Sequence, residues 1–287
     1  MKIAVIFDKL VTGTTGIYCI LALRKLGHEV DHFWLRDAEQ IPTHYDLYFR
    51  VDHGFYNRDL PRHLKPSVYW ALDIHHEHSF KAVTQMYRGY DFLFGCHQQE
   101  VEKLRQSGVP IQWIPVACDP EIHSKKEGDI RYDIAFVGGD NGIPRKFILQ
   151  ELRERYPNSF MGETLFNQMA DVYSLAKIGF NYSIRSDINM RFFEVMACGA
   201  MLLTNTLPRK DLNSLDIIPG RDFIEYRNFE ELFSLVEYYL YHDQERGRIA
   251  ESGHCKVIKE HTYLERVEQM LAKIRGQIPA SPGYSHL

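Results

Sequence analysis

The chain has 287 residues, of which 45% are hydrophobic, and this content can bury one large core or two ordinary ones. Its formal net charge is −4, so no overall basic field favours a nucleic acid partner. Any basic residues that matter for binding must therefore act locally.

Several features of the sequence bear on the compartment. The start, MKIAVIFDKL, lacks the long apolar region of a signal peptide, and no run approaches the roughly 18 apolar residues of a membrane span. The five cysteines are odd in number and include no CxxC pair, which favours reduced thiols over disulfides or structural zinc. We expect a cytoplasmic protein without an integral membrane segment, for which peripheral membrane contact stays open.

The first part of the chain alternates strand and helix patterns, which is typical of a parallel sheet covered by helices. The expected strands are 2–7, 28–35, 46–50, 67–72, 91–95 and 111–114, and the expected helices are 17–26 and 98–107. A glycine-containing loop, TGTTG at 12–16, follows the first strand. Residues 119–130, DPEIHSKKEGDI, are polar and without periodicity, which predicts a linker.

The pattern restarts after this linker with RYDIAFVGG, a strand that runs into a glycine turn. The expected strands are 158–161, 178–182 and 201–204, and the expected helices are 144–155, 167–176, a short one opening near Asn189 or Met190, 229–242, 243–253 and 261–275. We predict an α/β fold of two Rossmann-like domains, 1–120 and 131–275, facing a cleft, with a tail at 276–287. Ligands of such sheets bind outside the carboxyl ends of the strands.

The most informative segment is 181–205, NYSIRSDINMRFFEVMACGAMLLTN, which predicts a strand, a polar loop, a short helix and a buried strand. The helix would begin beside Arg185 and Arg191, and free N–H groups next to arginines suit a diphosphate. Glu194, one turn further in, can accept two hydrogen bonds from a ribose diol. These residues predict a nucleotide ligand.

Two other loops follow strands of the same half. Gly138 and Gly139 would let a ligand approach the backbone closely, and Arg145 at the start of the next helix can bind a phosphate. An ordinary tight turn between strand and helix explains the same residues. The loop that contains Thr164 can line the base, and a plain loop explains it equally well.

Over residues 130–275 the sequence resembles the nucleotide-binding half of GT-B glycosyltransferases, closest to the group-1-like branch that includes spore-maturation-type enzymes. The matching segments are FVGG…R at 136–145, AKIGFN at 176–181, RFFEVMACGAMLLTN at 191–205, GRDFIEYRNFEEL at 220–232 and HTYLERVEQML at 261–271. The resemblance implies that Glu194 binds the donor ribose, that Arg145 and Arg191 lie near the diphosphate, and that Asn181 shapes the same site.

One position departs from the pattern of many retaining enzymes of this fold. They carry a second glutamate eight positions before the ribose-binding one, and here that position is Ser186, followed by Asp187. Either Asp187 substitutes after a one-residue shift, or the sugar is held differently. The stereochemical outcome stays open.

The first half is expected to supply the acceptor side. Asp73 or His75, in YWALDIHHEHS after a strand, can act as general base. The end of the preceding strand offers further polar groups, namely Arg50, Asp52 and His53. The histidine cluster in this segment also resembles a metal site, but only weakly. Trp70 is a strand residue that suits a core, but because it lies close to Asp73 in the sequence it could also stack on an acceptor sugar.

We therefore predict a hexosyltransferase that moves a sugar from a nucleotide-diphosphate sugar to a hydroxyl on a glycan, lipid-linked or small-molecule acceptor, with a role in polysaccharide biosynthesis. Arginines and a helix N-terminus can neutralise the leaving group, so no metal or other cofactor is expected. Two alternatives remain: a catalytically silent nucleotide-sugar-binding protein, and another two-domain enzyme such as a nucleotide-sugar epimerase.

Overall fold

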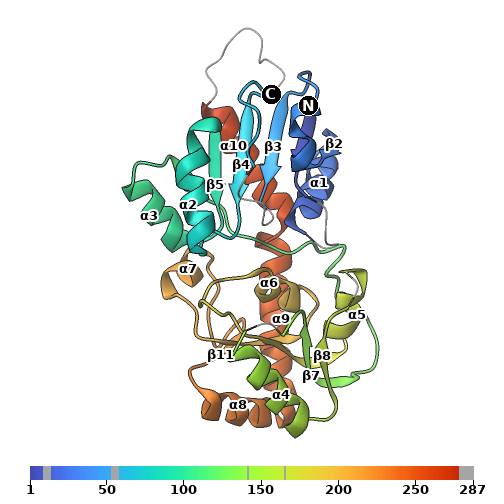
Figure 1. The fold of residues 1–287 in the computed structure, drawn as a ribbon. Coiled ribbons are helices and arrows are strands. Elements are labelled where there is room, and N and C mark those ends of the chain that lie inside the picture. The colour runs from blue at the N-terminus through green and yellow to red at the C-terminus, as the bar shows by residue number, and fades with distance from the viewer. Residues whose placement is uncertain (9–13, 53–57, 141, 165, 278–287) are drawn as a thin grey trace. The chain divides into compact units, whose positions relative to one another are not determined.

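The computed structural model describes residues 1–8, 14–52, 58–140, 142–164 and 166–277. The chain forms two compact units, one of residues 1–116 with the chain from Tyr263 onward and the other of Ala117–Thr262. Each unit contains one parallel sheet with helices on its faces (Figure 1). The prediction of two Rossmann-like α/β domains is therefore confirmed.

The first sheet has six parallel strands in the order β2-β1-β3-β4-β5-β6. Their bounds are β1 Lys2–Ile6, β2 Glu29–Phe33, β3 Leu47–Val51, β4 Ser67–Ala71, β5 Phe92–Gly95 and β6 Ile111–Trp113. The central strands β3 and β4 are buried at every residue, as expected for a sheet that helices cover on both sides. All six lie within or overlap the strands predicted for this half.

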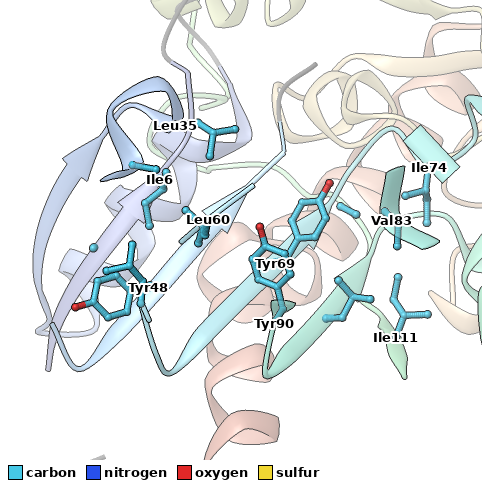
Figure 2. Packing of buried hydrophobic residues seen from close by; sticks show 14 of the residues in the cluster. Ile6, Leu35, Tyr48, Leu60, Tyr69, Ile74, Val83, Tyr90 and Ile111 are labelled. Carbon is cyan, nitrogen blue, oxygen red and sulfur yellow. The ribbon is translucent and has the colours of Figure 1, made fainter. Parts of the chain in front are cut away.

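One face of this sheet carries the core cluster drawn in Figure 2. Inward residues of alternate strand positions, among them Ile6, Tyr48 and Tyr69, pack with Val83 and Leu104. The covering elements are η1 Leu35–Gln40, α2 Glu77–Met86, η2 Tyr87–Gly89 and α3 Gln98–Gln106. The apolar side chains at every second strand position thus account for this layer.

The other face is covered by α1 Thr15–Lys25 and α10 Tyr263–Gln277, which pack against each other. The rings of Tyr18 and Tyr263 stack with centroids 4.6 Å apart. Trp70 on β4 meets the edge of Tyr263 at 6.2 Å. Because α10 packs there, it groups with the first unit, whereas the predicted boundary kept residues up to 275 with the second domain.

The second sheet has five parallel strands in the order β11-β10-β9-β7-β8. Their bounds are β7 Tyr132–Val137, β8 Ser159–Gly162, β9 Ala176–Asn181, β10 Met201–Asn205 and β11 Ile224–Tyr226. The helices of this unit are α4 Arg145–Arg155, η3 Phe166–Gln168, α5 Met169–Tyr173, α6 Met190–Ala197, α7 Arg209–Ser214, α8 Phe229–Tyr241 and α9 Asp243–Glu260. The central β9 and its neighbours therefore lie between two helix layers.

Helices α4 and α8 share one core cluster with alternate residues of the strands, such as Ile134 and Phe180. Helices α5, α6 and α9 contact the sheet or one another on the opposite face. Gly179 on β9 permits the close approach of α6, because a Cβ at this position would overlap Val195. The absence of a side chain at Gly179 therefore lets α6 pack close to the sheet.

The sequence missed several short elements. The elements α2, α7 and β11 were not predicted, and the histidines at the start of α2 make its apolar spacing hard to recognise. Residues 119–130 contain turns but no helix or strand, as a linker should. Even so, Asp119 and His123 are buried, so this segment packs on the second unit instead of lying in solvent.

No helix in the described ranges combines the length and the apolar content needed to cross a bilayer.

The Gly179–Val195 fit can be tested by stability. Gly179→Ala should lower the free energy of unfolding by about 2 kcal/mol, because the added methyl group has no space beside Val195. Chemical denaturation would measure it, with Gly247→Ala on α9 as the control, since a Cβ there meets nothing within 4 Å. Gly247→Ala should not lower the stability, because alanine is the better helix former. If Gly179→Ala loses no stability either, the close packing of α6 on β9 is wrong.

Candidate active site

Polar residues gather where the strands of the second sheet end. Gly138 and Gly139 follow β7 directly, Asn181 is the last residue of β9, and α6 begins at Met190 after the polar loop. Because these strands are parallel neighbours, their carboxyl ends lie at one edge of the sheet. The sequence analysis predicted a nucleotide site at this edge, which lies within the second unit.

Arg191 ties the parts of this edge together. Its Nε donates to the backbone oxygen of Val137 at 2.8 Å, and its Nη1 donates to Oδ1 of Asn181 at 3.2 Å. Its Nη2 lies against Gly138, where any Cβ would collide with it, and Gly138 has a φ of +138°. A glycine is therefore required at the end of β7 for two reasons, its backbone conformation and the space it leaves to the guanidinium.

Asn181 and Asn189 organise the start of α6. The Asn189 side chain accepts a hydrogen bond from the backbone N–H of Phe192 at 3.2 Å, so it caps the helix, which begins where the sequence predicted. Its Nδ2 donates to Oδ1 of the fully buried Asn181 at 3.3 Å, and Asn181 in turn donates to Thr204 at 3.1 Å. Through these bonds Asn181 connects the start of α6 to strand β10.

Arg145 brings a second guanidinium to the same edge. Its Nη2 donates to the backbone oxygen of Tyr182 at 3.0 Å and its Nη1 to that of Gly139 at 3.4 Å. Burial lowers the pKa of Arg145, and the positive charge of Arg191 lowers it further. An anion bound between two such guanidiniums would relieve their repulsion, which is the electrostatic property expected of a phosphate site.

Glu194 lies one turn into α6 and is 5% exposed. Burial raises the pKa of its carboxyl to about 7, against the opposing effect of Arg191. Within the described part of the chain the carboxylate accepts no hydrogen bond, and Nε2 of His123 lies 3.6 Å from its Oε1. A buried carboxylate whose oxygens can still accept hydrogen bonds is expected to have hydrogen-bond donors as partners, and a ribose diol offers two O–H groups.

The structure therefore joins seven of the eight predicted donor residues by contact or by direct charge interaction. These are Gly138, Gly139, Arg145, Asn181, Asn189, Arg191 and Glu194. Thr164 is half-buried two residues after β8, on the neighbouring loop, and its role in binding a base stays a prediction.

The position of the missing second glutamate has an unusual backbone. Ser186 has a φ of +53°, in the left-handed region. Oγ of Ser183 donates to the Asp187 carboxylate at 2.6 Å and accepts from the Asp187 backbone N–H at 2.7 Å, so a tight local turn holds Asp187. Whether Asp187 replaces the glutamate stays open.

In the first unit, Asp73 and His75 follow β4 and are half-buried. His75 Nδ1 lies 2.7 Å from Nε2 of His97, which precedes α3 at the end of the neighbouring strand β5. One ring must donate its N–H and the other accept it. Sequence reasoning missed His97, although its place just after a strand is the signal that selected Asp73 and His75.

Two acceptor-side expectations need correction. Arg50 and Asp52 are buried: Arg50 donates to Tyr90 at 2.7 Å and Asp52 accepts from Tyr69 at 2.8 Å, so they form a structural network inside the unit. Trp70 is fully buried and donates to the Ile114 backbone oxygen at 3.1 Å, which makes stacking on a sugar impossible. His53 lies outside the described residues.

Sequence reasoning also missed two residues beside Glu194. The sequence did not indicate His123, because it lies in the polar linker segment. It did not indicate Tyr173, because that residue lies in an apolar helix. The Tyr173 hydroxyl accepts a hydrogen bond from the Val137 backbone N–H at 2.9 Å, at the strand end that Arg191 also contacts. Only packing of distant segments brings these two residues to the site.

Comparison with known proteins bears on the family and on the fold. Residues 132–272 match the family model described as glycosyl transferase-like. A search of curated proteins gave no match. Among solved structures, Anabaena HepE in complex with UDP-glucose is 12% identical with a TM-score of 0.67, covering 96% of this chain and 100% of HepE.

Two further structures share the fold. Sucrose-phosphate synthase from Thermosynechococcus elongatus is 13% identical with a TM-score of 0.67, covering 98% of this chain and 100% of that chain. T4 phage BGT in complex with its UDP-glucose substrate is 16% identical with a TM-score of 0.62, covering 96% and 99%.

The matched segment includes all five strands of the second sheet together with Arg145, Arg191 and Glu194. This segment belongs to the glycosyl transferase-like family. The two Rossmann-like units have the GT-B fold, and residues 132–272 are a glycosyltransferase segment of the group-1-like branch. The closer likeness to spore-maturation-type enzymes stays a prediction.

Burial of the Glu194 carboxyl predicts how the stability of the protein depends on pH. In the unfolded chain it ionises near its ordinary pKa of 4.5, but in the folded protein near 7, so folding retains a proton between these values. The stability of the native protein therefore falls as the pH rises from about 4.5 to about 7, and Glu194→Gln removes this contribution. Relative to the parent, the variant should gain about 3 kcal/mol across that window.

Denaturant unfolding of both proteins at a series of pH values would measure this difference. All other titrating groups are shared and cancel in the comparison. A difference in unfolding free energy that stays constant from pH 4.5 to pH 7 would show that Glu194 ionises normally in the folded protein.

Proposed function

We propose that the chain transfers a hexose from a nucleotide-diphosphate sugar to an acceptor hydroxyl without a metal ion. The observation that carries the proposal is the pair of guanidiniums, Arg145 and Arg191, at the strand edge where α6 begins. HepE and T4 phage BGT, which share the fold, are bound to UDP-glucose in their structures. A UDP-hexose is therefore the first donor to test.

In this proposal the second unit binds the donor and stabilises the leaving group. The reaction breaks the bond between the sugar C1 and the diphosphate oxygen, and negative charge develops on the diphosphate. Arg145, Arg191 and the positive end of the α6 helix dipole would stabilise that charge. Because arginines and a helix end supply the positive charge, the proposal needs no divalent cation.

Glu194 would fix the nucleoside. An ionised carboxylate accepts both ribose O–H groups, whereas the protonated form offers a weaker acceptor and an unwanted donor. Since the pKa of Glu194 is about 7 in the unliganded protein, donor binding should strengthen as the pH rises through this value. Two O–H donors from the ribose would in turn favour the charged form.

On the acceptor side, Asp73 or His75 would take the proton from the attacking hydroxyl as its oxygen bonds to C1. Both follow β4 in the first unit, and His75 has a hydrogen-bonded partner in His97 that fixes its ring. A side chain held in this way can accept a proton in a defined direction. The acceptor is a hydroxyl compound such as a glycan, a lipid-linked sugar or a small molecule, and a cytoplasmic location belongs to the proposal.

One observation favours a second candidate, a binding protein without catalytic activity. Ser186 replaces the sugar-facing glutamate of many retaining enzymes, and the neighbouring Asp187 is hydrogen-bonded to Ser183. Slow hydrolysis of the bound donor, assayed with several nucleotide sugars, separates the two candidates, because many transferases pass sugar to water. A nucleotide-sugar epimerase would instead isomerise the donor.

The donor assignment predicts a large loss of affinity in Glu194→Ala. Calorimetric titration with UDP-glucose should show at least a tenfold weaker Kd, because two charge-assisted hydrogen bonds to the ribose are lost. Glu231→Ala is a matched control, since Glu231 is on the first turn of α8, where its carboxylate already pairs with Arg227. Equal affinity of Glu194→Ala and the parent would remove the ribose assignment.

The acceptor assignment predicts a different pattern for Asp73→Asn. Turnover should fall about a hundredfold or more if Asp73 is the base, while the Kd for the donor changes little, because the residue acts on the acceptor. The assay is run with EDTA, since the proposal requires no metal. Full activity of Asp73→Asn, with a loss in His75→Gln, transfers the role to His75; full activity of both ends the assignment.

A further inference from the structure

His123 stands out among the buried residues that the proposed reaction does not use. It lies in the polar segment 119–130, yet it is 0% exposed and packs inside the second unit. A histidine without exposure, in a segment otherwise rich in charge, needs a structural or functional reason. Two contacts of its ring provide one.

The first contact fixes the position of the ring proton. The backbone N–H of Asp119 donates to Nδ1 of His123 at 3.0 Å, so Nδ1 is an acceptor and carries no proton. The backbone oxygen of Asp119 also accepts from the N–H groups of Ile122 and His123, which closes the turn and holds the ring. The neutral imidazole must therefore carry its proton on Nε2.

The second contact places that proton at the donor-binding carboxylate. Nε2 of His123 is 3.6 Å from Oε1 of Glu194, at the distance of a charge–dipole contact rather than of a short hydrogen bond. Both side chains are buried, and such a contact is stronger where water is excluded. It comes from one side only, so the other lone pairs of the carboxylate remain for a ligand.

We propose that His123 is a positioning residue, whose neutral Nε2–H holds the Glu194 carboxylate ionised and oriented for the ribose diol of the donor. This inference rests on the proposed function, and it adds a residue that acts through Glu194 without touching the nucleotide. The turn at 119–123 would thereby contribute to donor binding, although it lies about 70 residues before Glu194 in the sequence.

The ionisation states agree with this geometry. Burial lowers the pKa of His123 to about 4, so the ring is neutral at physiological pH and remains a one-proton donor. Other titratable or charged groups also act on or lie near Glu194: Arg191 from α6, Cys198 directly after α6, Tyr173 from α5, and His254 of α9, which contacts the α6 backbone. Arg191 is the cation among them that favours the carboxylate, and His123 adds a dipole from another element.

Two variants of His123 separate the two contacts. In His123→Asn, Oδ1 can still accept from the Asp119 N–H, but no group reaches Glu194. In His123→Gln, the longer side chain can place an N–H near the position of Nε2. The asparagine variant therefore keeps the turn and loses the carboxylate contact, whereas the glutamine variant keeps a donor for Glu194.

The first measurement is the titration of Glu194 in the unliganded full chain, followed by NMR with ¹³C-labelled glutamate and assigned through Glu194→Gln. We expect the titration midpoint to move to higher pH in His123→Asn and to return toward the parent value in His123→Gln. An unchanged midpoint in a folded His123→Asn would overturn the proposal, whatever the donor proves to be.

The second measurement is the affinity for UDP-glucose as a function of pH, with thermal unfolding as the check on folding. At pH 7, His123→Asn should bind about three- to tenfold more weakly than the parent, and the loss should shrink at higher pH. A purely structural role would lower the thermal stability but leave the pH midpoint of binding unmoved, and this result contradicts the proposal. If the parent itself binds no nucleotide sugar while Glu194 still responds to His123, the proposed function fails separately.

Discussion

The site depends on the way in which Arg191 is held. One guanidinium bonds to the end of β7 and to the end of β9 while its own helix begins beside them, so it cross-links three elements that are distant in the sequence. The arrangement requires Gly138 at the strand end and Asn181 beneath the helix. Removing any of these partners would shift the α6 N-terminus, and with it the positive end of the helix dipole proposed to stabilise the diphosphate.

Burial gives the same region its electrostatic character. Close packing of α6 on β9, which Gly179 permits, removes Glu194 from water and raises its pKa to about 7. A carboxyl group that ionises near neutrality responds strongly to nearby dipoles and to ligand hydroxyls. The cost of burying this group is thus connected with its proposed use, and His123 provides a fixed dipole on one side of it.

Much of this could be predicted from local sequence. The alternation of strand and helix patterns indicated both parallel sheets, and the polar loop before an apolar segment indicated a short helix starting near Asn189 or Met190, where α6 begins. The rule that ligands lie at strand ends selected Gly138, Gly139 and Arg145. It failed for Arg50 and Asp52, because the sequence does not show which strand-end side chains turn into the core. His97 follows a strand as His75 does, so the same rule could have selected it. The contact of His123 with Glu194 depends on the packing of separate segments, which no local pattern contains.

The most direct test of the account is a crystal structure of the full chain with bound UDP-glucose. We expect the diphosphate to contact Arg145 and Arg191 at the start of α6, with both ribose hydroxyls within hydrogen-bond distance of the Glu194 carboxylate. Density for the nucleotide at any other part of the molecule, with these three side chains free of ligand, would contradict the central claim.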